Sequence, residues 1–390
     1  MLSSKPFPFL RKARTRWLVL ALGLLGPFAL WGQASHAVDP SLFVLSDSIT
    51  QPKPKLSVQF YADLYWGTAF RPGQSQLPYL VSHQRTGGPQ VNLVAADIQF
   101  KAHRWRSRFV PAWGTYMQAN YAAEPKGLAQ HLVEASVGFR PLKQKNIWIE
   151  AGLLSSPITN ENAFSLDQLL LTRSFAPEFS PYFLTGAKLV VPFGKKWTGS
   201  LYVVNGWQTI RQQNKNWGLV GQVEFKPTDQ DVWNANVYTA NEEKTGQAFL
   251  RQRFLFDLYW THQGKGKWQF SSNLYWGQQA LLEPIVGQPQ RFQWWQANVQ
   301  ARYRLHSQWW LAGRTEYFSD PHARIVPVNS PGNAFQQWSQ TLGLQTLVAK
   351  KLLWRVEYRY AWGPTKVYED QEGKASSQQH WLLVGLACRF

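Results

Sequence analysis

The sequence of 390 residues is poor in sulfur, with one cysteine and two methionines. A single cysteine excludes a disulfide bond within the chain, and we interpret Cys388 as a packing residue. Long apolar runs are also scarce, and the one extended run spans residues 17–30 near the start. No later segment has the ~18 consecutive apolar residues of a membrane-spanning helix. The rest of the chain is therefore expected to be either a soluble exported protein or a β-barrel that crosses a membrane.

Catalytic signatures are lacking as well. The sequence contains no Gly-rich phosphate loop, no H-E-x-x-H motif, no G-x-S-x-G motif and no metal-like cluster of cysteine and histidine. A lipid hydrolase embedded in a membrane would need serine and histidine side by side on the outer face, and no such pair is present. We therefore expect neither an enzyme nor a cofactor or metal site.

The first 37 residues have the features of a secretory signal peptide. Four basic residues precede the apolar run, and the small residues Ser35 and Ala37 follow it at the positions that signal peptidase requires. We predict cleavage after Ala37, a periplasmic lead-in at 38–54 and a single barrel domain at 55–390. Cleavage removes five basic residues and no acidic ones, which lowers the formal net charge from +18 to +13. The alternative is a retained transmembrane helix.

Alternating apolar and polar residues recur along the rest of the chain and predict sixteen β-strands. Most of these segments are about a dozen residues long, which matches the 9–11 residues of a tilted strand across a bilayer better than the ~5–6 residues of soluble strands. Aromatic residues make up 15% of the chain, with 21 tryptophans, as expected of a membrane barrel. The predicted strands are 55–66, 90–101, 107–120, 129–140, 146–155, 181–192, 197–207, 216–226, 231–241, 251–262, 267–278, 292–305, 308–319, 336–349, 352–363 and 379–390.

The connections between these segments alternate in length. Tight turns follow the even-numbered segments, and mostly longer loops follow the odd-numbered ones, such as 67–89 and 156–180. Outer-membrane barrels have short periplasmic turns and long extracellular loops. The pattern therefore predicts an antiparallel transmembrane β-barrel in the outer membrane of a Gram-negative type of bacterium.

The segment "LLWRVEYRYAW" at 352–362 shows why the apolar residues should face lipid. One set of alternate residues is aromatic or aliphatic, and the other set is Arg355, Glu357 and Arg359. An arginine turned toward lipid costs up to about 2–4 kcal/mol near the midplane. We therefore expect the charged set to line a hydrated interior, because sixteen strands enclose an aqueous channel.

Two further features support an orientation in the membrane. Tryptophans open alternate strands directly after tight turns and share the apolar face, which predicts a belt at one membrane interface. These residues are Trp197, Trp233, Trp268, Trp309 and Trp354. The chain ends on an apolar alternating strand with Phe390, which we interpret as the signal that the barrel-assembly machinery binds.

The longest loop, 156–180, is too apolar in its middle to extend into solvent. We predict that it folds into the barrel, packs Phe164, Leu166, Leu169 or Leu170 against the wall and narrows the pore. The alternative is a loop that caps the mouth or contacts another subunit. The predicted pore-lining residues are Glu161, Asp167, Arg173 and Glu178 on the loop, and Arg253, Arg302, Arg314, Glu316, Arg355, Glu357 and Arg359 on the wall.

Basic residues at or beside the tight turns account for most of the positive charge. We interpret them as contacts with anionic phospholipid headgroups of the inner leaflet rather than as a nucleic-acid site. An anion-selective pore is the less favoured alternative. The residues are Lys101, Arg104, Arg106, Arg108, Arg140, Lys143, Lys145, Lys195, Lys196, Lys226, Lys265, Lys267, Lys350 and Lys351.

Eight segments, in the same order along the chain, resemble the beta-barrel porin-2 family of outer-membrane proteins. They are "NYAAEP" (120–125), "NIWIEAGLLSSPI" (146–158), "LTRSFAPEFSPYFLTGAKL" (171–189), "YVVNGWQ" (202–208), "FKPTD" (225–229), "ARYRL" (301–305), "RTEYFSD" (314–320) and "LLWRVEYRYAW" (352–362). The resemblance covers nearly the whole mature chain and implies an outer-membrane barrel that acts as a porin. It departs from the family at the turn His306–Ser307.

The sequence thus predicts a porin that lets small hydrophilic solutes or ions diffuse through a water-filled channel. The alternative is a non-conducting barrel that serves as a subunit of a surface or secretion complex. A homotrimer is one option for the oligomeric state, and a monomer is another. Outer-membrane lipids and small solutes are the expected partners.

Overall fold

The computed structural model describes residues 53–71, 73–212, 214–243, 250–282, 289–328, 334–349 and 351–390. The predicted signal peptide at 1–37 and most of the predicted lead-in therefore lie outside the described residues. Within the described residues, no helix combines the length and apolar character needed to cross a bilayer.

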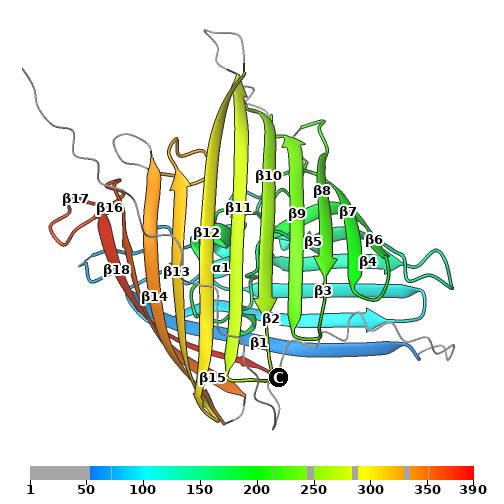
Figure 1. Ribbon diagram of the computed structural model, residues 1–390, viewed down its shortest axis with the longest axis horizontal. Coiled ribbons are helices and arrows are strands. Elements are labelled where there is room, and N and C mark those ends of the chain that lie inside the picture. Colours follow the sequence, from blue (N-terminus) through cyan, green and yellow to red (C-terminus); the bar gives the residue numbers. More distant parts are fainter. Residues whose placement is uncertain are drawn as a thin grey trace, which may run out of the picture. The chain divides into compact units, whose positions relative to one another are not determined.

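Sixteen antiparallel strands form one closed barrel, in which each strand pairs with its neighbours in the chain (Figure 1). Figure 1 shows β9 to β13 side by side in one wall. The barrel strands are β1 (Lys55–Thr68), β2 (Gln90–Lys101), β3 (Trp105–Trp113), β4 (Leu132–Phe139), β5 (Trp148–Ser155), β6 (Phe183–Pro192), β7 (Trp197–Val204), β8 (Gly218–Phe225), β9 (Asp231–Asn241), β10 (Leu250–His262), β11 (Trp268–Leu282), β12 (Pro289–His306), β13 (Trp309–Asp320), β14 (Phe335–Val348), β15 (Leu352–Trp362) and β18 (Gln378–Arg389).

The barrel closes between its first and last strands. β1 pairs with β18 in antiparallel register from Tyr61 opposite Arg389 to Thr68 opposite Leu382. Phe390 extends this ladder, because its amide donates to the Phe60 carbonyl (3.0 Å) and its carbonyl accepts from the Phe60 amide (2.8 Å). Closure leaves no open sheet edge. A barrel in lipid requires such closure, because unpaired backbone groups at an edge would have no hydrogen-bond partners there.

The two faces of the wall differ as the alternation predicts. In β15, Arg355, Glu357 and Arg359 are almost completely buried on the inner face, whereas Tyr358 on the other face is 43% exposed. Large apolar side chains such as Leu342 (57% exposed) cover the outside. The exposed apolar surface is therefore the surface that contacts lipid, and the charged set points inward.

All sixteen predicted segments contain a strand, but several boundaries were wrong, and the largest difference is in the third segment. The predicted strand 107–120 ends at Trp113, and the helix α1 (Thr115–Asn120) follows it. Gly114 makes the change of direction at φ 134°, where a Cβ would lie 2.3 Å from the Asn92 carbonyl oxygen. The turn therefore requires glycine at this position.

The loops contain several short elements. Those of the long loop segment are η3 (Ser165–Asp167) and α2 (Phe175–Glu178), and a 3-10 turn, η2 (Leu128–His131), precedes β4. β16 (Tyr368–Glu369) and β17 (Ala375–Ser376) form a small hairpin between β15 and β18. This hairpin was not predicted from the sequence.

A hydrophobic core lies among inner-face residues and loops. Phe175 of α2 and Phe179, which follows α2, make edge-on contacts with Phe318 of β13 and Phe335 of β14. The ring centroids are 5.3–6.5 Å apart. Buried residues of the segment 69–80 join the same cluster. Burial of these side chains removes apolar area from water, which stabilises the packed arrangement of the loops by about 25 cal/mol per Å².

Candidate functional site

Carboxylates on the inner face accept hydrogen bonds from the backbone of segment 156–180. Glu357 accepts from the amides of Leu171 (2.7 Å) and Thr172 (3.2 Å), and also from the Thr172 hydroxyl. Asp257 accepts a hydrogen bond from the amide of Thr159 (3.1 Å). Thr159 has a φ of 67°, which a β-branched residue rarely adopts. Irregular backbone needs such partners when it is buried.

Glu316 lies at the centre of a buried ion-pair group. It accepts from Arg314 Nε (3.1 Å), Arg359 Nη2 (2.7 Å) and the Phe175 amide (2.6 Å). The two arginines donate in turn to the carbonyls of the segment, Arg314 to Thr172 (2.7 Å) and Arg359 to Arg173 (3.0 Å). Removal of one partner from such a group leaves an uncompensated buried charge.

Arg355 connects the segment to a second polar network. It donates to the carbonyls of Ser165 (2.7 Å) and Leu170 (3.1 Å). The Ser165 amide donates to the Tyr61 hydroxyl (2.9 Å), and Tyr61 lies beside Asp63. The wall of β15 and β1 thus holds both ends of the stretch 165–170.

Glycines in the wall make room for two leucines of the segment. A Cβ at Gly385 would lie 2.5 Å from Leu171 Cδ1, and one at Gly343 would lie 3.0 Å from Leu170 Cδ2. Leu170 and Leu171 are completely buried. From the sequence, Phe164, Leu166, Leu169 or Leu170 was predicted to pack against the wall, but Leu171 was not.

The predicted charges of the segment pair with local or wall partners. Arg173 binds Glu178 within the segment (3.1 Å), and Asp167 binds Arg389 of β18 (2.9 Å). Glu161 accepts from the Ser174 amide (3.0 Å), and its other oxygen lies 3.9 Å from Arg314. Burial raises the pKa of both Glu161 and Asp167 above the ordinary values, although Arg314 and Arg389 respectively oppose the shift.

For two of the predicted wall residues, no hydrogen bond or ion pair with segment 156–180 is found among the described residues. Arg253 donates to Gln279 (2.7 Å), and its guanidinium lies over the Trp207 ring (4.7 Å). Arg302 donates to Gln269 (2.7 Å) and to Gln345 (3.3 Å). The structure brings Arg314, Glu316, Arg355, Glu357 and Arg359 together with the segment, and their role as pore-lining residues stays a prediction.

The opposite wall carries a second charged group on its inner face. Arg108 binds Asp97 (2.9 Å) and Glu134 (3.0 Å), and its side chain is 32% exposed. Arg106 and Lys188 both bind Glu150 at 2.5 Å, with side chains 18% and 21% exposed. These pairs lie on β2 to β6 and, unlike the group around Glu316, stay in contact with water.

This group corrects one interpretation from the sequence. Arg106 and Arg108 were assigned to the basic rim at the tight turns, but their side chains belong to the inner face of β3. The physical reason is parity, because both share a face with the buried residues Val110 and Ala112. The alternation from Arg106 to Ala112 could have revealed their direction.

The predicted belt residues lie on the outer face near the starts of alternate strands. Their exposed fractions range from 39% for Trp309 to 49% for Trp268, and Trp354 is half-buried. Trp105 at the start of β3 is 51% exposed and belongs to the same set, although the sequence analysis did not name it. The interfacial role of these residues stays a prediction, as does the role of Phe390 in assembly.

Among the described residues, no group of three or more histidine, cysteine or carboxylate side chains could hold a metal ion.

A closed barrel of sixteen strands, with an apolar outer surface and charged residues inside, is the architecture of an outer-membrane channel. The family model described as "Putative beta-barrel porin-2, OmpL-like" matches residues 55–390. The chain belongs to this family, and the protein is an outer-membrane porin.

Solved structures of outer-membrane channels share the fold. The channel DcaP of Acinetobacter baumannii superposes with a TM-score of 0.56 at 8% identity, covering 86% of this chain and 97% of that one. An anion-selective porin from Comamonas acidovorans gives 0.53 at 10% identity, covering 87% and 100%. The trimer form of OmpT from Vibrio cholerae gives 0.53 at 10% identity, covering 86% and 99%.

A comparison with curated proteins found no match. The family match confirms the predicted family, and the solved structures confirm the predicted barrel of sixteen antiparallel strands. At these identities the structures establish the fold alone, so the solute and the selectivity are not transferred from them.

Proposed function

We propose that the barrel lets small hydrophilic solutes and ions diffuse passively, through a lumen that segment 156–180 narrows. The observation that supports this proposal is the contrast in exposure between the two charged groups. Arg314, Glu316 and Arg359 are buried against the segment, whereas Arg108 and Lys188 on the opposite wall stay partly exposed. Water and solutes would pass along β2 to β8, where charged side chains are accessible.

Mixed charge along this path favours weak selectivity. Arg106, Arg108 and Lys188 each bind a carboxylate, so the potential from such a pair falls off quickly. Solutes would meet a polar surface that can donate and accept hydrogen bonds. Such a surface is suited to hydrophilic molecules of different kinds rather than to one ligand.

Planar bilayer recording of the purified barrel tests the proposal. We expect discrete current steps, and we expect sugars of increasing size to enter barrel-containing liposomes until a sharp size limit is reached. An inserted, folded barrel that gives no steps and admits no sugar would contradict it. Arg108→Gln should change the ion selectivity, whereas the same change at the exposed loop residue Arg211 should not.

A non-conducting barrel in a surface or secretion complex is the second candidate. The aromatic core around Phe175, Phe318 and Phe335 favours it, because apolar packing at this level excludes water locally. Copurification of the barrel with one stable partner, together with absent conductance, would support this candidate over the first.

A homotrimer is our proposal for the oligomeric state. A solved structure with the same fold, OmpT of Vibrio cholerae, is described as a trimer form. Light scattering of the barrel in a mild detergent measures the protein mass directly, and a mass of one chain would contradict the proposal.

We also propose that the protein is not an enzyme and that its partners are lipids, solutes and the barrel-assembly machinery. The absence of catalytic motifs from the sequence supports the first statement. The exposed apolar face and the terminal Phe390, which is 63% exposed, support the others.

A further inference from the structure

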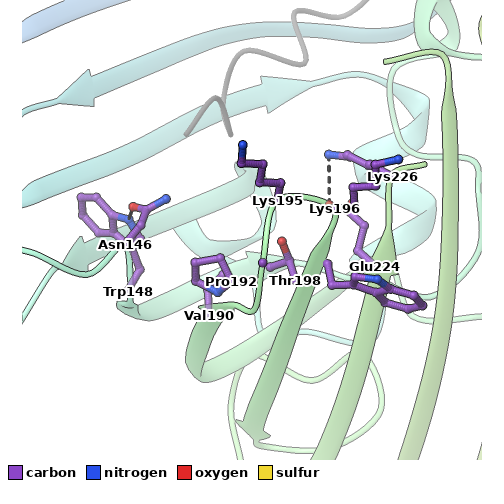
Figure 2. A pocket seen from close by; sticks show the side chains of 11 residues that line it. Asn146, Trp148, Val190, Pro192, Lys195, Lys196, Thr198, Glu224 and Lys226 are labelled. Carbon is purple, nitrogen blue, oxygen red and sulfur yellow. Dashed lines mark hydrogen bonds and ion pairs between the residues drawn. The ribbon is translucent and has the colours of Figure 1, made fainter. Parts of the chain in front are cut away.

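A small pocket lies at the turn side of the barrel, between the ends of β5 to β8 (Figure 2). Trp148, Val190 and Pro192 form its apolar side, and Lys195, Lys196 and Lys226 gather on the other side in Figure 2. Short turns of outer-membrane barrels face the periplasm. The pocket therefore opens at the periplasmic end of the wall along which we propose that solutes pass.

The pocket belongs to the inner face rather than to the lipid face. Trp148 and Val190 are paired in register, and both share parity with Glu150 and Lys188. Both are buried, at 8% and 5% exposure, whereas Leu189 beside them faces outward at 38%. A molecule that enters the pocket would therefore come from the water of the channel mouth.

Positive charge in the pocket exceeds the negative charge available to balance it. Glu224 binds Lys226 at 3.0 Å. Glu150, which lies on β5 like Trp148, already binds Arg106 and Lys188. Lys195 and Lys196 are exposed in the turn, and no ion pair to either is found among the described residues. Lys195 and Lys196 thus line the pocket without a carboxylate partner among the described residues.

The apolar side of the pocket strengthens the attraction for an anion. Trp148 Nε1 donates to Asn146 Oδ1 (2.7 Å), and the Arg106 guanidinium lies over the same ring (4.2 Å). A wall of low dielectric constant focuses the field of nearby charges into the space beside it. Thr198 also lines the pocket, and its hydroxyl can donate a hydrogen bond.

We propose that this pocket binds small oxyanions, which are solutes with a free phosphate or carboxylate group. Lysine ammonium groups suit such anions because each is a compact charge with three rotatable donors. The proposal rests on the proposed porin function for the access of solutes to the inner face. It adds a specific anion site, at the periplasmic mouth, to the proposed channel.

Calorimetric titration with inorganic phosphate tests the site on the detergent-purified barrel. We expect saturable binding that weakens on the order of tenfold in the variant Lys195→Gln/Lys196→Gln, because two nearby charges are lost. The matched control is Lys265→Gln/Lys267→Gln, which removes the same charge from the turn between β10 and β11. This control should bind phosphate as the native chain does, and circular dichroism should show equal β content in all three proteins.

Equal weakening in both variants would overturn the proposal, because it would assign the effect to diffuse charge on the rim. Absence of saturable binding to the native chain would overturn it as well. A lipid headgroup is the other source of phosphate, so the titration is repeated in nanodiscs of zwitterionic lipid and of phosphatidylglycerol. If the lysine variant changes only the recovery of anionic lipid and not phosphate binding, the site is a headgroup site and the proposal fails.

The binding measurement separates this proposal from the porin function. A barrel that never conducts but binds phosphate through Lys195 and Lys196 retains the site and loses the proposed function. A barrel that conducts but binds no phosphate retains the function and loses the site.

Discussion

The two sides of the barrel interior use the same residue types for different purposes. On β13 and β15, arginine and glutamate side chains are completely buried and hold the backbone of segment 156–180. On β2 to β6, similar pairs around Arg108 and Glu150 keep 11–32% of their side-chain surface exposed. Charge of similar composition therefore acts as an anchor on one wall and as a hydrated surface on the other.

The difference shows that composition does not decide what a charged residue in a barrel does. The neighbouring backbone decides it. Where irregular chain lies against the wall, its amides and carbonyls need partners, and buried carboxylates and guanidinium groups supply them. On β2 to β6 the same groups pair mainly with each other and keep part of their surface in water.

Glu316→Ala should give the largest effect on this contrast. It leaves Arg314 and Arg359 buried without their shared carboxylate, which is expected to destabilise the fold by about 3–5 kcal/mol. Urea unfolding in detergent micelles measures the change, and bilayer recording should show larger and noisier currents as the segment loosens. A change below about 1 kcal/mol with unaltered currents would refute the anchoring role.

Gly385→Val should have the next largest effect. The added side chain occupies the space of Leu171, so overpacking is expected to cost about 1–3 kcal/mol and to displace the segment. Gly313→Val is the matched control, because Gly313 faces outward on β13 and has only the Thr341 carbonyl within 4 Å. Equal losses of unfolding free energy in both variants would show that the segment does not need the glycine.

Glu150→Gln should sharpen the other side of the comparison. The pairs with Arg106 and Lys188 are partly exposed, so we expect a stability loss of only about 1 kcal/mol. Two basic residues would lose their partner at the water-exposed wall, and the reversal potential in a salt gradient should shift toward anions. An unchanged reversal potential would place the conducting path elsewhere.

Asp167→Asn should give the smallest effect, visible as a change in pH dependence. Burial raises the pKa of Asp167, so the folded chain holds this proton more tightly than the unfolded chain. Its contribution to stability is therefore full below the unfolded pKa of about 4 and is lost as the pH rises through the higher folded pKa. The Asp167→Asn variant should therefore not lose this contribution to stability as the pH rises.

Unfolding free energies measured from mildly acidic to neutral pH check this prediction. One proton changes the slope by at most about 1.4 kcal/mol per pH unit. Asp229→Asn, in an exposed turn, should leave the slope as it is. A slope that stays unchanged in Asp167→Asn as well would contradict the prediction.

Much of the fold was predictable because it depends on local rules. The side chains of a strand alternate between two faces, so the pattern around Arg355 and Glu357 was enough to assign an inner and an outer set. The prediction failed where the alternation continued past a strand end, at Gly114, because only the close approach to Asn92 makes that glycine necessary. The alternation placed the charged residues of β13 and β15 on one face, but it did not indicate that backbone groups of segment 156–180 would be their partners.

The site was less predictable because its contacts join distant parts of the chain. Glu357 and Leu171 are separated by 186 residues, and nothing near either residue in the sequence indicates the other. The same applies to Arg106 and Glu150, which are 44 residues apart on different strands. Because these partners are far apart in the sequence, the sequence did not show which of the charges would be buried.

By itself, the sequence determined the number of strands and the direction of their side chains, since a repeat of two residues follows from backbone geometry alone. Only the tertiary structure decided which charges hold a loop and which remain in water. The reason is that a buried charge is stable only beside its partners, and closure of the barrel is what brings those partners together.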